Sequence, residues 1–397
     1  MLREAVALHQ AGEIARAEAL YRRVLRVRKD DSNALHLLGV ALRQQGALAE
    51  ALRQLDRAVT LAPGNALFRA NRGAALADAG RLAEAVTDLS LAAAGRPQDA
   101  TTLRNLGQAM AALGNAQGAL DPLSRAVAAA PDAPEPRLAL AHALREAGDG
   151  AAAAEAARAA QARAPAGSEI ERESRFLLAA LGAAPPPDRA PADYVRALFD
   201  RYAPRFDADL EGRLGYRTPA LLAALIERSG VAPTKTLRVL DLGCGTGLSG
   251  VALAPFATRM EGLDLSPRML EEAARRNIYA ALHEADLEFF VRAHPGEWDL
   301  IAAADVLNYL GELAPALQGI ARALTPGGIA AFSIETGEGG GYALGEGLRY
   351  RHDPEHVAAL AQAAGLREQA RESVVLREER GAPVRGTLFV YRAAAAP

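Results

Sequence analysis

A 34-residue recurrence of glycine constrains the first part of the chain more than any other feature. The glycines that share this spacing are Gly12, Gly46, Gly80, Gly114 and Gly148. Alanine follows each of them after five residues, and proline follows all but the first after seventeen residues. Glycine readily ends a helix and proline cannot continue one, so each period indicates two helices joined by a turn. We therefore predict five helix–turn–helix units over residues 1–165.

Small residues recur in the same register, seven positions before four of these glycines, at Gly39, Gly73, Gly107 and Ala141. They allow two helices to pack closely. Together these positions resemble the tetratricopeptide repeat, whose period is also 34. A single repeat cannot bury its apolar face, so repeats stack into an all-α solenoid with a concave groove. The resemblance therefore implies a solenoid that binds a protein or peptide partner.

The resemblance implies that the first helix of each pair faces this groove. The residues it assigns to the groove are Asn33, His36, Asn71, Arg104, Asn105 and Gln108, together with Val40, Arg43, Ala74 and His142. Asn71 and Asn105 occupy equivalent positions, from which side-chain amides can hydrogen-bond a peptide backbone. The alternative is that asparagine is simply a common residue at this position of the repeat.

The repeats are followed by a boundary. Ser168 and Glu171 form a Ser-x-x-Glu capping box, which predicts a helix within residues 166–182 that closes the solenoid. Residues 183–192 contain four prolines and cannot be helical. We expect this stretch to be a semi-rigid linker to a second domain over residues 193–397.

Strand and helix patterns alternate through the second domain. Strands are expected at 239–242, 260–263, 279–283, 298–303, 326–334, 370–377 and 386–392, with helices between them, including 218–229, 312–324 and 353–364. Such alternation predicts a doubly wound, Rossmann-like sheet with helices on both faces. The last two strands form a hairpin, so one strand is antiparallel and the sheet is mixed. The predicted fold is thus an α solenoid followed by an α/β domain.

The most informative motif of this domain follows its first strand. Asp241 is followed by glycines at alternate positions, Gly243, Gly245 and Gly247, and then by a helical pattern. Such glycines let the backbone turn sharply and approach a ligand closely. A nicotinamide fingerprint requires glycine three residues after the second one, where this chain has Leu248. Asp264, at the end of the second strand, is suited to bind both hydroxyls of a ribose.

The ordered motifs resemble those of class I S-adenosylmethionine-dependent methyltransferases. They are residues 241–247, 262–266, 285–287, 299–301 and 324–328. The order of repeats and methyltransferase, with 199–207, 214–216 and 347–352, is similar to a bacterial group of predicted tetratricopeptide-repeat methyltransferases. The cofactor implied is S-adenosyl-L-methionine.

The resemblance assigns a role to each cofactor-site residue. Asp241 would orient the glycine loop, and Gly243, Cys244, Gly245 and Gly247 would line the methionine part of the cofactor. Asp264 would bind the ribose, and Leu265 and Met269 would pack near the adenine. Asp286 would accept the adenine amino group beside Leu287. Ala304 and Asp305 would lie near the sulfonium, and Tyr202 would close over the cofactor. Met269 and Tyr202 have core packing as the alternative.

The acceptor side is less constrained. Methyl transfer mainly requires positioning of the nucleophile, and a base is needed only where the acceptor must lose a proton. The catalytic candidates are His352, Glu335 and Tyr309. A structural role beside the helix cap at Asp353 is the alternative for His352. Residues 337–347 are rich in glycine, so we expect a mobile loop over the acceptor site.

Composition excludes several classes of function. The net charge of −3 gives no electrostatic case for nucleic acid, and no run of about 18 apolar residues predicts a membrane span. The single cysteine, Cys244, fits a reducing compartment, and no metal site is expected. The N-terminus lacks a signal-peptide pattern, so we expect a cytoplasmic protein. The Asn/Asp-Pro-Pro-Tyr/Phe motif of amino-methylating DNA enzymes is absent at 304–307.

Three hypotheses follow. The first is a methyltransferase whose repeats recruit a protein or peptide substrate or partner. The second is a small-molecule methyltransferase that uses the repeats for partner docking or dimerisation. The third is a non-catalytic scaffold that retains the cofactor fold, against which the intact motifs argue.

Overall fold

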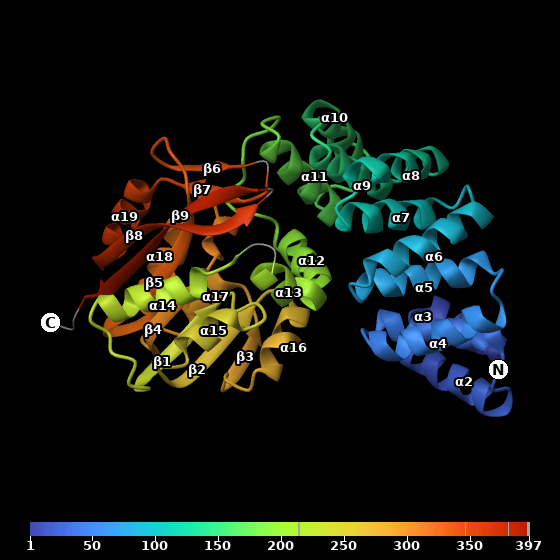
Figure 1. The fold of residues 1–397 in the computed structure, drawn as a ribbon, viewed down its shortest axis with the longest axis horizontal. Helices are drawn as coiled ribbons and strands as arrows, with labels where there is room; N and C mark the ends of the chain where they lie inside the picture. Colours follow the sequence, from blue (N-terminus) through green and yellow to red (C-terminus); the bar gives the residue numbers. More distant parts are fainter. Residues whose placement is uncertain (213–214, 346, 380, 395–397) are drawn as a thin grey trace. The chain divides into compact units, whose positions relative to one another are not determined.

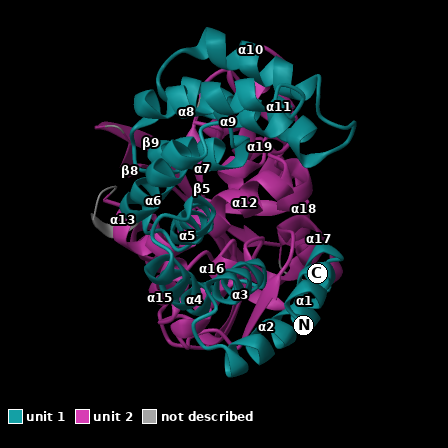
Figure 2. Ribbon diagram, turned by 90° about the vertical axis from the view of Figure 1, so that its right-hand side faces the viewer, with its two compact units in different colours: residues 1–174 teal, residues 175–397 magenta. Residues whose placement is uncertain are grey.

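The computed structural model describes residues 1–212, 215–345, 347–379 and 381–394. Leu214 and Glu346, which belong to two of the motifs above, lie outside the described residues. The chain divides into two compact units, residues 1–174 and 175–397 (Figure 2). Each unit has its own hydrophobic core, so each is described by itself.

The first unit consists of five successive helix pairs (Figure 1). The pairs are α1 (Leu2–Gln10) with α2 (Ile14–Val27), α3 (Ser32–Gln44) with α4 (Leu48–Leu61), α5 (Ala66–Asp78) with α6 (Leu82–Gly95), α7 (Ala100–Ala112) with α8 (Ala116–Ala129), and α9 (Pro134–Glu146) with α10 (Gly150–Gln161). These pairs correspond in order to the five helix–turn–helix units expected over residues 1–165.

The periodic glycines end the first helix of each pair. Gly46 has φ of 80°, a left-handed conformation that favours glycine. Its N–H donates to the carbonyl of Arg43 at 3.0 Å, and the N–H of Ala47 donates to Leu42 at 2.9 Å. These bonds satisfy carbonyls that the end of the helix leaves free. The equivalent glycines at 12, 80, 114 and 148 also have positive φ.

The small residues of the repeat lie where the two helices of a pair touch. A Cβ on Gly39 would stand 2.5 Å from Cγ of Leu55 and 3.1 Å from the carbonyl oxygen of Ala51. Gly73 faces Leu89 in the same way. In the fifth pair Ala141 and Ala157 stand in these positions, so a larger residue on one helix is matched by a smaller one on the other.

One predicted groove residue lies inside the solenoid. His36 is 5% exposed, stacks on Phe68 at 4.5 Å between ring centroids, and accepts a hydrogen bond from Nδ2 of Asn71 at 2.7 Å. Burial lowers the pKa of His36 to about 4, so the ring is neutral. The expectation that His36 faces the groove is therefore corrected, because its position on α3 packs against α5. Asn33 and Gln108 are exposed, and Arg104 and Asn105 are partly exposed.

The division between the units falls within α11 (Glu169–Ala180). Its start is capped, because Oγ of Ser168 accepts the N–H of Glu171 at 3.3 Å. Its second half packs in the second unit, where the ring of Phe176 lies 5.4 Å from that of Tyr194.

The segment expected to be a semi-rigid linker between domains is hydrogen-bonded within the second unit. The carbonyl of Asp188 accepts the N–H groups of Gly311 and Glu312 at 2.8 and 2.9 Å, and the N–H of Ala190 donates to the carbonyl of Tyr309 at 2.9 Å. The hydroxyl of Tyr350 donates to the carbonyl of Pro187 at 2.6 Å. Proline content predicted that these residues are not helical, but long-range backbone pairing fixes their place.

Nine strands of the described chain form one mixed sheet in the order β3-β2-β1-β4-β5-β7-β6, with β9 antiparallel to β5 and β8 beside β9. The strands are β1 (Leu237–Leu242), β2 (Ala257–Asp264), β3 (Ala281–Glu284), β4 (Trp298–Ala303), β5 (Leu324–Thr336), β6 (Tyr342–Leu344), β7 (Tyr350–His352), β8 (Leu366–Glu379) and β9 (Ala382–Ala393). The doubly wound sheet with an antiparallel C-terminal hairpin is confirmed (Figure 1).

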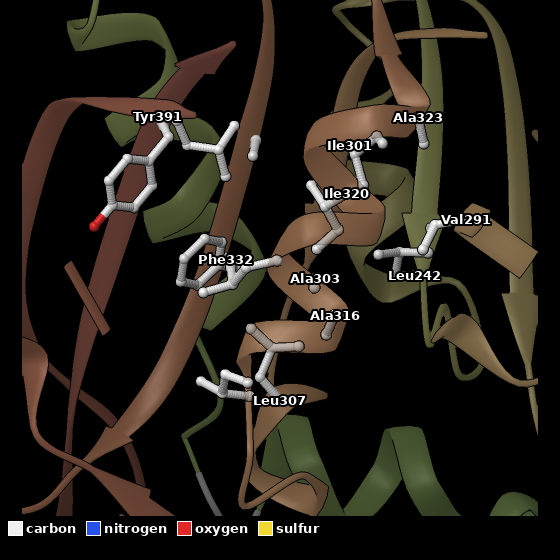
Figure 3. Packing of buried hydrophobic residues seen from close by; sticks show 14 of the residues in the cluster. Leu242, Val291, Ile301, Ala303, Leu307, Ala316, Ile320, Ala323, Phe332 and Tyr391 are labelled. Carbon is white, nitrogen blue, oxygen red and sulfur yellow. The ribbon is translucent and has the colours of Figure 1, made fainter. Parts of the chain in front are cut away.

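Helices cover both faces of this sheet. They are α12 (Ala192–Tyr202), η1 (Ala203–Arg205), α13 (Phe206–Gly212), α14 (Thr218–Arg228), α15 (Leu248–Leu253), α16 (Pro267–Arg275), α17 (Leu287–Ala293), η2 (Leu307–Tyr309), α18 (Ala314–Ala323) and α19 (Pro354–Ala363). On β4, Ile301 joins the core with α17 and α18 (Figure 3). Leu300 joins the core with α14 and α15 on the other face. Both faces are buried, which explains the continuous apolar run of this strand.

The start of α14 is connected to a distant segment of the chain, because the hydroxyl of Thr218 donates to Oδ2 of Asp305 at 3.2 Å. One local prediction differs from the structure. The glycine-rich stretch 337–347 was expected to be a mobile loop, but Tyr342–Leu344 pair with β7 as strand β6. Tyr342 fixes this strand, because its hydroxyl donates to Asp188 at 3.1 Å.

Gly39, at the contact between α3 and α4, allows the close packing of the repeat to be tested. Replacing Gly39 with alanine forces a methyl group against the buried Leu55, which costs about 1–3 kcal/mol and exceeds the gain in helix propensity of about 1 kcal/mol. Gly64→Ala is the matched control, because nothing lies within 4 Å of its added Cβ. Urea unfolding followed by circular dichroism should give a lower midpoint for Gly39→Ala alone. Equal midpoints would contradict the close packing.

Candidate functional site

A cavity of about 310 Å³ opens beyond the carboxyl ends of β1, β2 and β4. Loops after parallel strands meet at this edge of a doubly wound sheet, which is where such folds bind ligands. Its walls come from the glycine loop after β1, the segments that follow β2, β3 and β4, the helices α12 and α13, and the end of β8. All of these elements belong to the second unit.

The glycine loop forms the floor of the cavity. Gly243, Gly245 and Gly247 have φ of 59°, 53° and 90°, all in the left-handed region. A Cβ on Gly243 would lie 2.5 Å from Cγ2 of Val306, so only glycine fits there. Gly243, Cys244 and Gly245 line the cavity, whereas Gly247 precedes α15 and is not part of its lining.

Asp241 fixes the conformation of this loop through buried hydrogen bonds. Its side chain is fully buried, and Oδ2 accepts the hydroxyls of Ser249 at 2.7 Å and Tyr279 at 2.6 Å. Burial raises the pKa of Asp241 to about 6, against the lowering effect of these two hydrogen bonds. Asp241 does not line the cavity, so it acts on the shape of the loop.

Asp264 connects the loop to the next helix. Oδ2 accepts the N–H of Gly245 at 3.0 Å and Oδ1 accepts the N–H of Ser266 at 2.8 Å. Burial raises the pKa of this carboxyl also to about 6. Asp264 and Leu265 line the cavity, whereas Met269 is fully buried outside its lining. The packing alternative for Met269 therefore describes its position.

Asp286 and Leu287 line the cavity next to Asp264. Asp286 caps α17 by accepting the N–H of Glu288 at 3.0 Å, and it forms an ion pair with Arg189. Arg189 also lines the cavity, and its Nη1 lies 3.4 Å from Oε2 of Glu288. The sequence contained no motif for this arginine, because it belongs to the proline-rich stretch and reaches its partner across 97 residues of chain.

Aromatic residues of the N-terminal segment close the cavity on one side. Phe199, Tyr202 and Phe206 line it, and the ring of Phe199 lies 5.5 Å from that of Tyr309. Two carboxylates attach this segment to the rest of the site. Oδ1 of Asp200 accepts the hydroxyl of Ser266 at 2.6 Å, and Oδ1 of Asp207 accepts the hydroxyl of Thr246 at 2.5 Å.

The opposite end of the cavity is charged. Asp305 follows β4 with φ of 56°, a strained conformation for a residue other than glycine. Its carboxylate accepts the hydroxyls of Thr218 and Ser333, each at 3.2 Å, and burial raises its pKa. Ala304 and Asp305 both line the cavity.

The three catalytic candidates lie in different surroundings. Tyr309 lines the cavity, and burial raises the pKa of its phenol, which is therefore protonated at neutral pH. Glu335 is 4% exposed and forms ion pairs with Arg349 and Arg377. His352 is 1% exposed, and its Nε2 donates to the carbonyl of Gly311 at 3.1 Å.

Neither Glu335 nor His352 is among the residues that line the cavity. Burial also lowers the pKa of His352, so the ring is neutral. Of the three catalytic candidates, Tyr309 therefore lines the cavity, whereas Glu335 and His352 lie outside its lining.

Sequence reasoning assigned no individual role to much of the lining, although some of these residues lie within the motifs. The additional residues are Arg189, Ala190, Val195, Leu198, Phe199, Phe206, Tyr216, Thr246, Leu248, Ser249, Leu263, Ala285, Val306, Asn308, Leu310, Arg349, Arg377 and Glu379. The lining residues of the N-terminal segment and of the motifs are adjacent in sequence to residues that had been assigned a role. Arg377 and Glu379 stand on the last hairpin, far from any motif, and only pairing of β8 with β9 beside β5 brings them here.

The described residues contain no group of three or more His, Cys, Asp or Glu side chains able to hold a metal ion. Among the described helices, none has the length and apolar character that crossing a membrane requires.

Residues 239–328 match a family model described as a methyltransferase domain, and residues 2–66, 50–100 and 70–134 match a model of the tetratricopeptide repeat. The chain is 31% identical over 155 residues to a ubiquinone biosynthesis O-methyltransferase of Thiobacillus denitrificans, covering 34% of this chain and 66% of the relative. It is 35% identical over 182 residues to a trans-aconitate 2-methyltransferase of Pseudomonas aeruginosa, covering 38% and 64%. The chain thus spans under two thirds of the length of these relatives.

Among solved structures, the N-methyltransferase NodS from Bradyrhizobium japonicum in complex with S-adenosyl-L-homocysteine has a TM-score of 0.41 and 21% identity. The match covers 50% of this chain and 98% of NodS.

The raised pKa of Asp241 predicts how stability depends on pH. Below about pH 4 the carboxyl is protonated in both states, and above about pH 6 it is ionised in both. Between these values the unfolded chain has lost the proton that the folded protein retains, so stability falls as pH rises, by about 3 kcal/mol. Asp241→Asn removes this contribution and keeps an oxygen for Ser249 and Tyr279. Its urea midpoint should fall less steeply over this range, with Asp264 retaining a similar dependence.

Asp299→Asn is the control of opposite sign. Hydrogen bonds from Arg238 hold the pKa of Asp299 below its usual value, so its contribution is present above the ordinary pKa and is lost as pH falls. Asp299→Asn should therefore lower the midpoint near neutral pH. An unchanged slope in Asp241→Asn would show that burial does not disfavour the charged form of Asp241.

Proposed function

We propose that this chain, in which tetratricopeptide repeats precede a methyltransferase domain, is an S-adenosylmethionine-dependent methyltransferase whose repeats recruit a protein or peptide substrate or partner. The observation that carries the first part is the glycine cradle, where Asp264 accepts the N–H of Gly245 beneath an open cavity. The family models and the printed activities of the relatives support the same reaction.

The residues of the cavity fit such a cofactor. In our proposal the backbone of Gly243 to Gly245 holds the methionine part, Asp264 holds the ribose, and Asp286 with Leu287 holds the adenine. Asp241 and Gly247 act indirectly, by fixing the shape of the loop. Tyr202 and its aromatic neighbours exclude water from the other side. When bound, the cofactor supplies an electrophilic methyl group activated by a sulfonium.

The chain's own residues then position the acceptor. Tyr309 reaches the cavity as a neutral phenol, which orients an acceptor by hydrogen bonding and does not serve as a base at neutral pH. Glu335 lies outside the cavity lining and forms ion pairs with Arg349 and Arg377, so we assign it to positioning these two arginines. We assign His352 to the support of the chain at Gly311. Asp305 is the carboxylate that faces the cavity.

Recruitment of polypeptide rests on the repeats. Groove residues Asn33, Arg104, Asn105 and Gln108 are exposed or partly exposed on first helices of their pairs. Asn71 is engaged with His36, so we propose Asn105 as the amide that contacts a peptide backbone.

The small-molecule alternative is favoured by the relatives, whose printed names specify ubiquinone biosynthesis and trans-aconitate. In that case the repeats would serve docking or dimerisation. For either function we propose a cytoplasmic location, with which the single buried thiol of Cys244 agrees.

Cofactor binding gives the most direct test. Asp264→Ala removes the acceptor of two loop N–H groups and of the ribose hydroxyls, so the affinity for S-adenosylmethionine should fall at least tenfold, or about 1.4 kcal/mol. Isothermal titration calorimetry of the full chain measures this loss. Asp299→Ala, on strand β4 of the same sheet and outside the cavity lining, is the matched control. Equal affinities in wild type and Asp264→Ala would remove Asp264 from the site.

A labelling experiment separates the two acceptor classes. The full chain is incubated with methyl-labelled S-adenosylmethionine and an extract of the cells that produce it, and products are divided by size. We expect label on proteins, located by mass spectrometry, and at least a tenfold loss in Asn105→Ala/Gln108→Ala because the groove no longer presents the substrate. Label in the small-molecule fraction, unaffected by these substitutions, would support the alternative instead.

A further inference from the structure

Residues 187–190, at the end of the proline-rich stretch, form part of the cavity wall, and we call them the strap. Arg189 and Ala190 line the cavity, and Ala190 is 2% exposed. Arg189 pairs with Leu310 in an antiparallel β-bridge, so the strap runs beside the segment that follows η2. A short stretch without a sequence motif therefore contributes to the predicted cofactor site.

Two tyrosines attach the strap to the hairpin of β6 and β7. The hydroxyl of Tyr350, on β7, donates to the carbonyl of Pro187 at 2.6 Å. The hydroxyl of Tyr342, on β6, donates to Oδ1 of Asp188 at 3.1 Å. Neither tyrosine is among the residues that line the cavity. Through these hydroxyls the hairpin acts on the cavity by way of the strap.

Arg189 attaches the strap to the segment that follows β3. Its guanidinium forms an ion pair with Asp286, and its Nη1 lies 3.4 Å from Oε2 of Glu288. Oδ1 of Asp286 accepts the N–H groups of Glu288 and Phe289 at 3.0 and 3.3 Å, whereas Oδ2 accepts a hydrogen bond from Arg189. Each carboxylate oxygen can accept two hydrogen bonds, so Oδ2 keeps a place for an adenine amino group while Arg189 fixes its direction.

We propose that the strap closes the adenine end of the cofactor site, with Arg189 as a positioning residue for Asp286, so that bound cofactor dissociates only after the strap has been released. This inference rests on the proposed methyltransferase function, in which Asp286 and Leu287 hold the adenine. The strap is attached by individual hydrogen bonds and an ion pair, each of modest energy. It can therefore open locally while the sheet stays folded.

The dissociation rate of S-adenosylhomocysteine tests the strap, because it is measured without knowledge of the methyl acceptor. Tyr342→Phe/Tyr350→Phe removes both hydroxyls and keeps both rings. Without these hydrogen bonds the open strap is more populated, so dissociation from the full chain should be at least threefold faster. The rate is obtained by loading the protein with radiolabelled S-adenosylhomocysteine and adding an excess of the unlabelled compound.

Tyr391→Phe is the matched control. Tyr391 is 1% exposed on β9, lies outside the cavity lining, and its hydroxyl donates to Oε2 of Glu368 at 3.3 Å. This variant also loses the hydroxyl of a buried tyrosine, but it leaves the strap unchanged. Its dissociation rate should equal that of the wild type. The same acceleration in Tyr391→Phe would show that the effect does not come from the strap.

Arg189→Met tests the other attachment, because it removes the ion pair with Asp286 and keeps a side chain that packs. Dissociation should again be at least threefold faster, and Arg189→Lys, which can still donate to Oδ2, should restore part of the difference. Arg196→Met is the matched control, since Arg196 pairs with Glu284 at 3.1 Å outside the cavity lining. Slower dissociation from Arg189→Met would show that Arg189 competes with the cofactor for Asp286, which would overturn its positioning role.

Hydrogen exchange of the wild type decides where a variant does not fold. The N–H of Ala190 donates to the carbonyl of Tyr309 at 2.9 Å, and saturating S-adenosylhomocysteine should slow its exchange at least tenfold. The N–H of Gly296 donates to the carbonyl of Arg322 at 2.9 Å outside the cavity lining, and its exchange should change less than twofold. Exchange at Ala190 that is the same with and without the ligand would contradict the strap.

The two proposals fail in different ways. If S-adenosylhomocysteine binds but dissociates equally fast from the wild type and from Tyr342→Phe/Tyr350→Phe, the strap is wrong and the proposed methyltransferase function stands. If the compound does not bind the full chain, both proposals fail.

Discussion

Two buried carboxylates at the ends of neighbouring parallel strands hold the site together. Asp241 ends β1 and binds Ser249 and Tyr279, while Asp264 ends β2 and binds the N–H groups of Gly245 and Ser266. The glycine loop is thus fixed from both sides in a left-handed backbone that it would not keep alone. Burial raises the pKa of both carboxyls, which means that ionising them here lowers the free energy of unfolding. That cost is reasonable only where a ligand uses the loop or the charge.

The features predicted from sequence are those determined locally or by parallel-strand topology. The periodic glycines end helices through their own φ angles, so the repeats follow from spacing alone. The apolar runs of β1 and β4 and the acids at strand ends follow from burial on both faces of the sheet. The resemblance implied one site for Asp264, Asp286 and Asp305, and they line one cavity because the carboxyl ends of parallel strands meet at one edge of the sheet.

The features missed depend on contacts between distant segments. Arg189 lies in a stretch whose composition indicated a semi-rigid linker, and neither residue alone predicts its pairing with Asp286. His36 stood at a groove position by register but packs on Phe68 of the next repeat. His352 had the intrinsic pKa of a base, whereas its burial and its bond to Gly311 depend on strands β6 and β7 that the glycine-rich composition concealed. The motifs therefore predicted the cavity lining after β1, β2 and β3 better than they predicted the surroundings of Glu335 and His352.

The cluster of Asp305, Glu335, Glu379, Arg349 and Arg377 is poorly explained as a source of stability. Desolvating charges of both signs costs free energy that their attraction often only repays, and apolar residues of similar volume usually stabilise a core as well. The rest of this sheet is packed with apolar side chains on both faces, one of which is drawn in Figure 3. These five charged groups gather at one end of the cavity, beside the strained residue Asp305. Their position at the edge of an open cavity gives this arrangement a functional reason that stability alone does not supply.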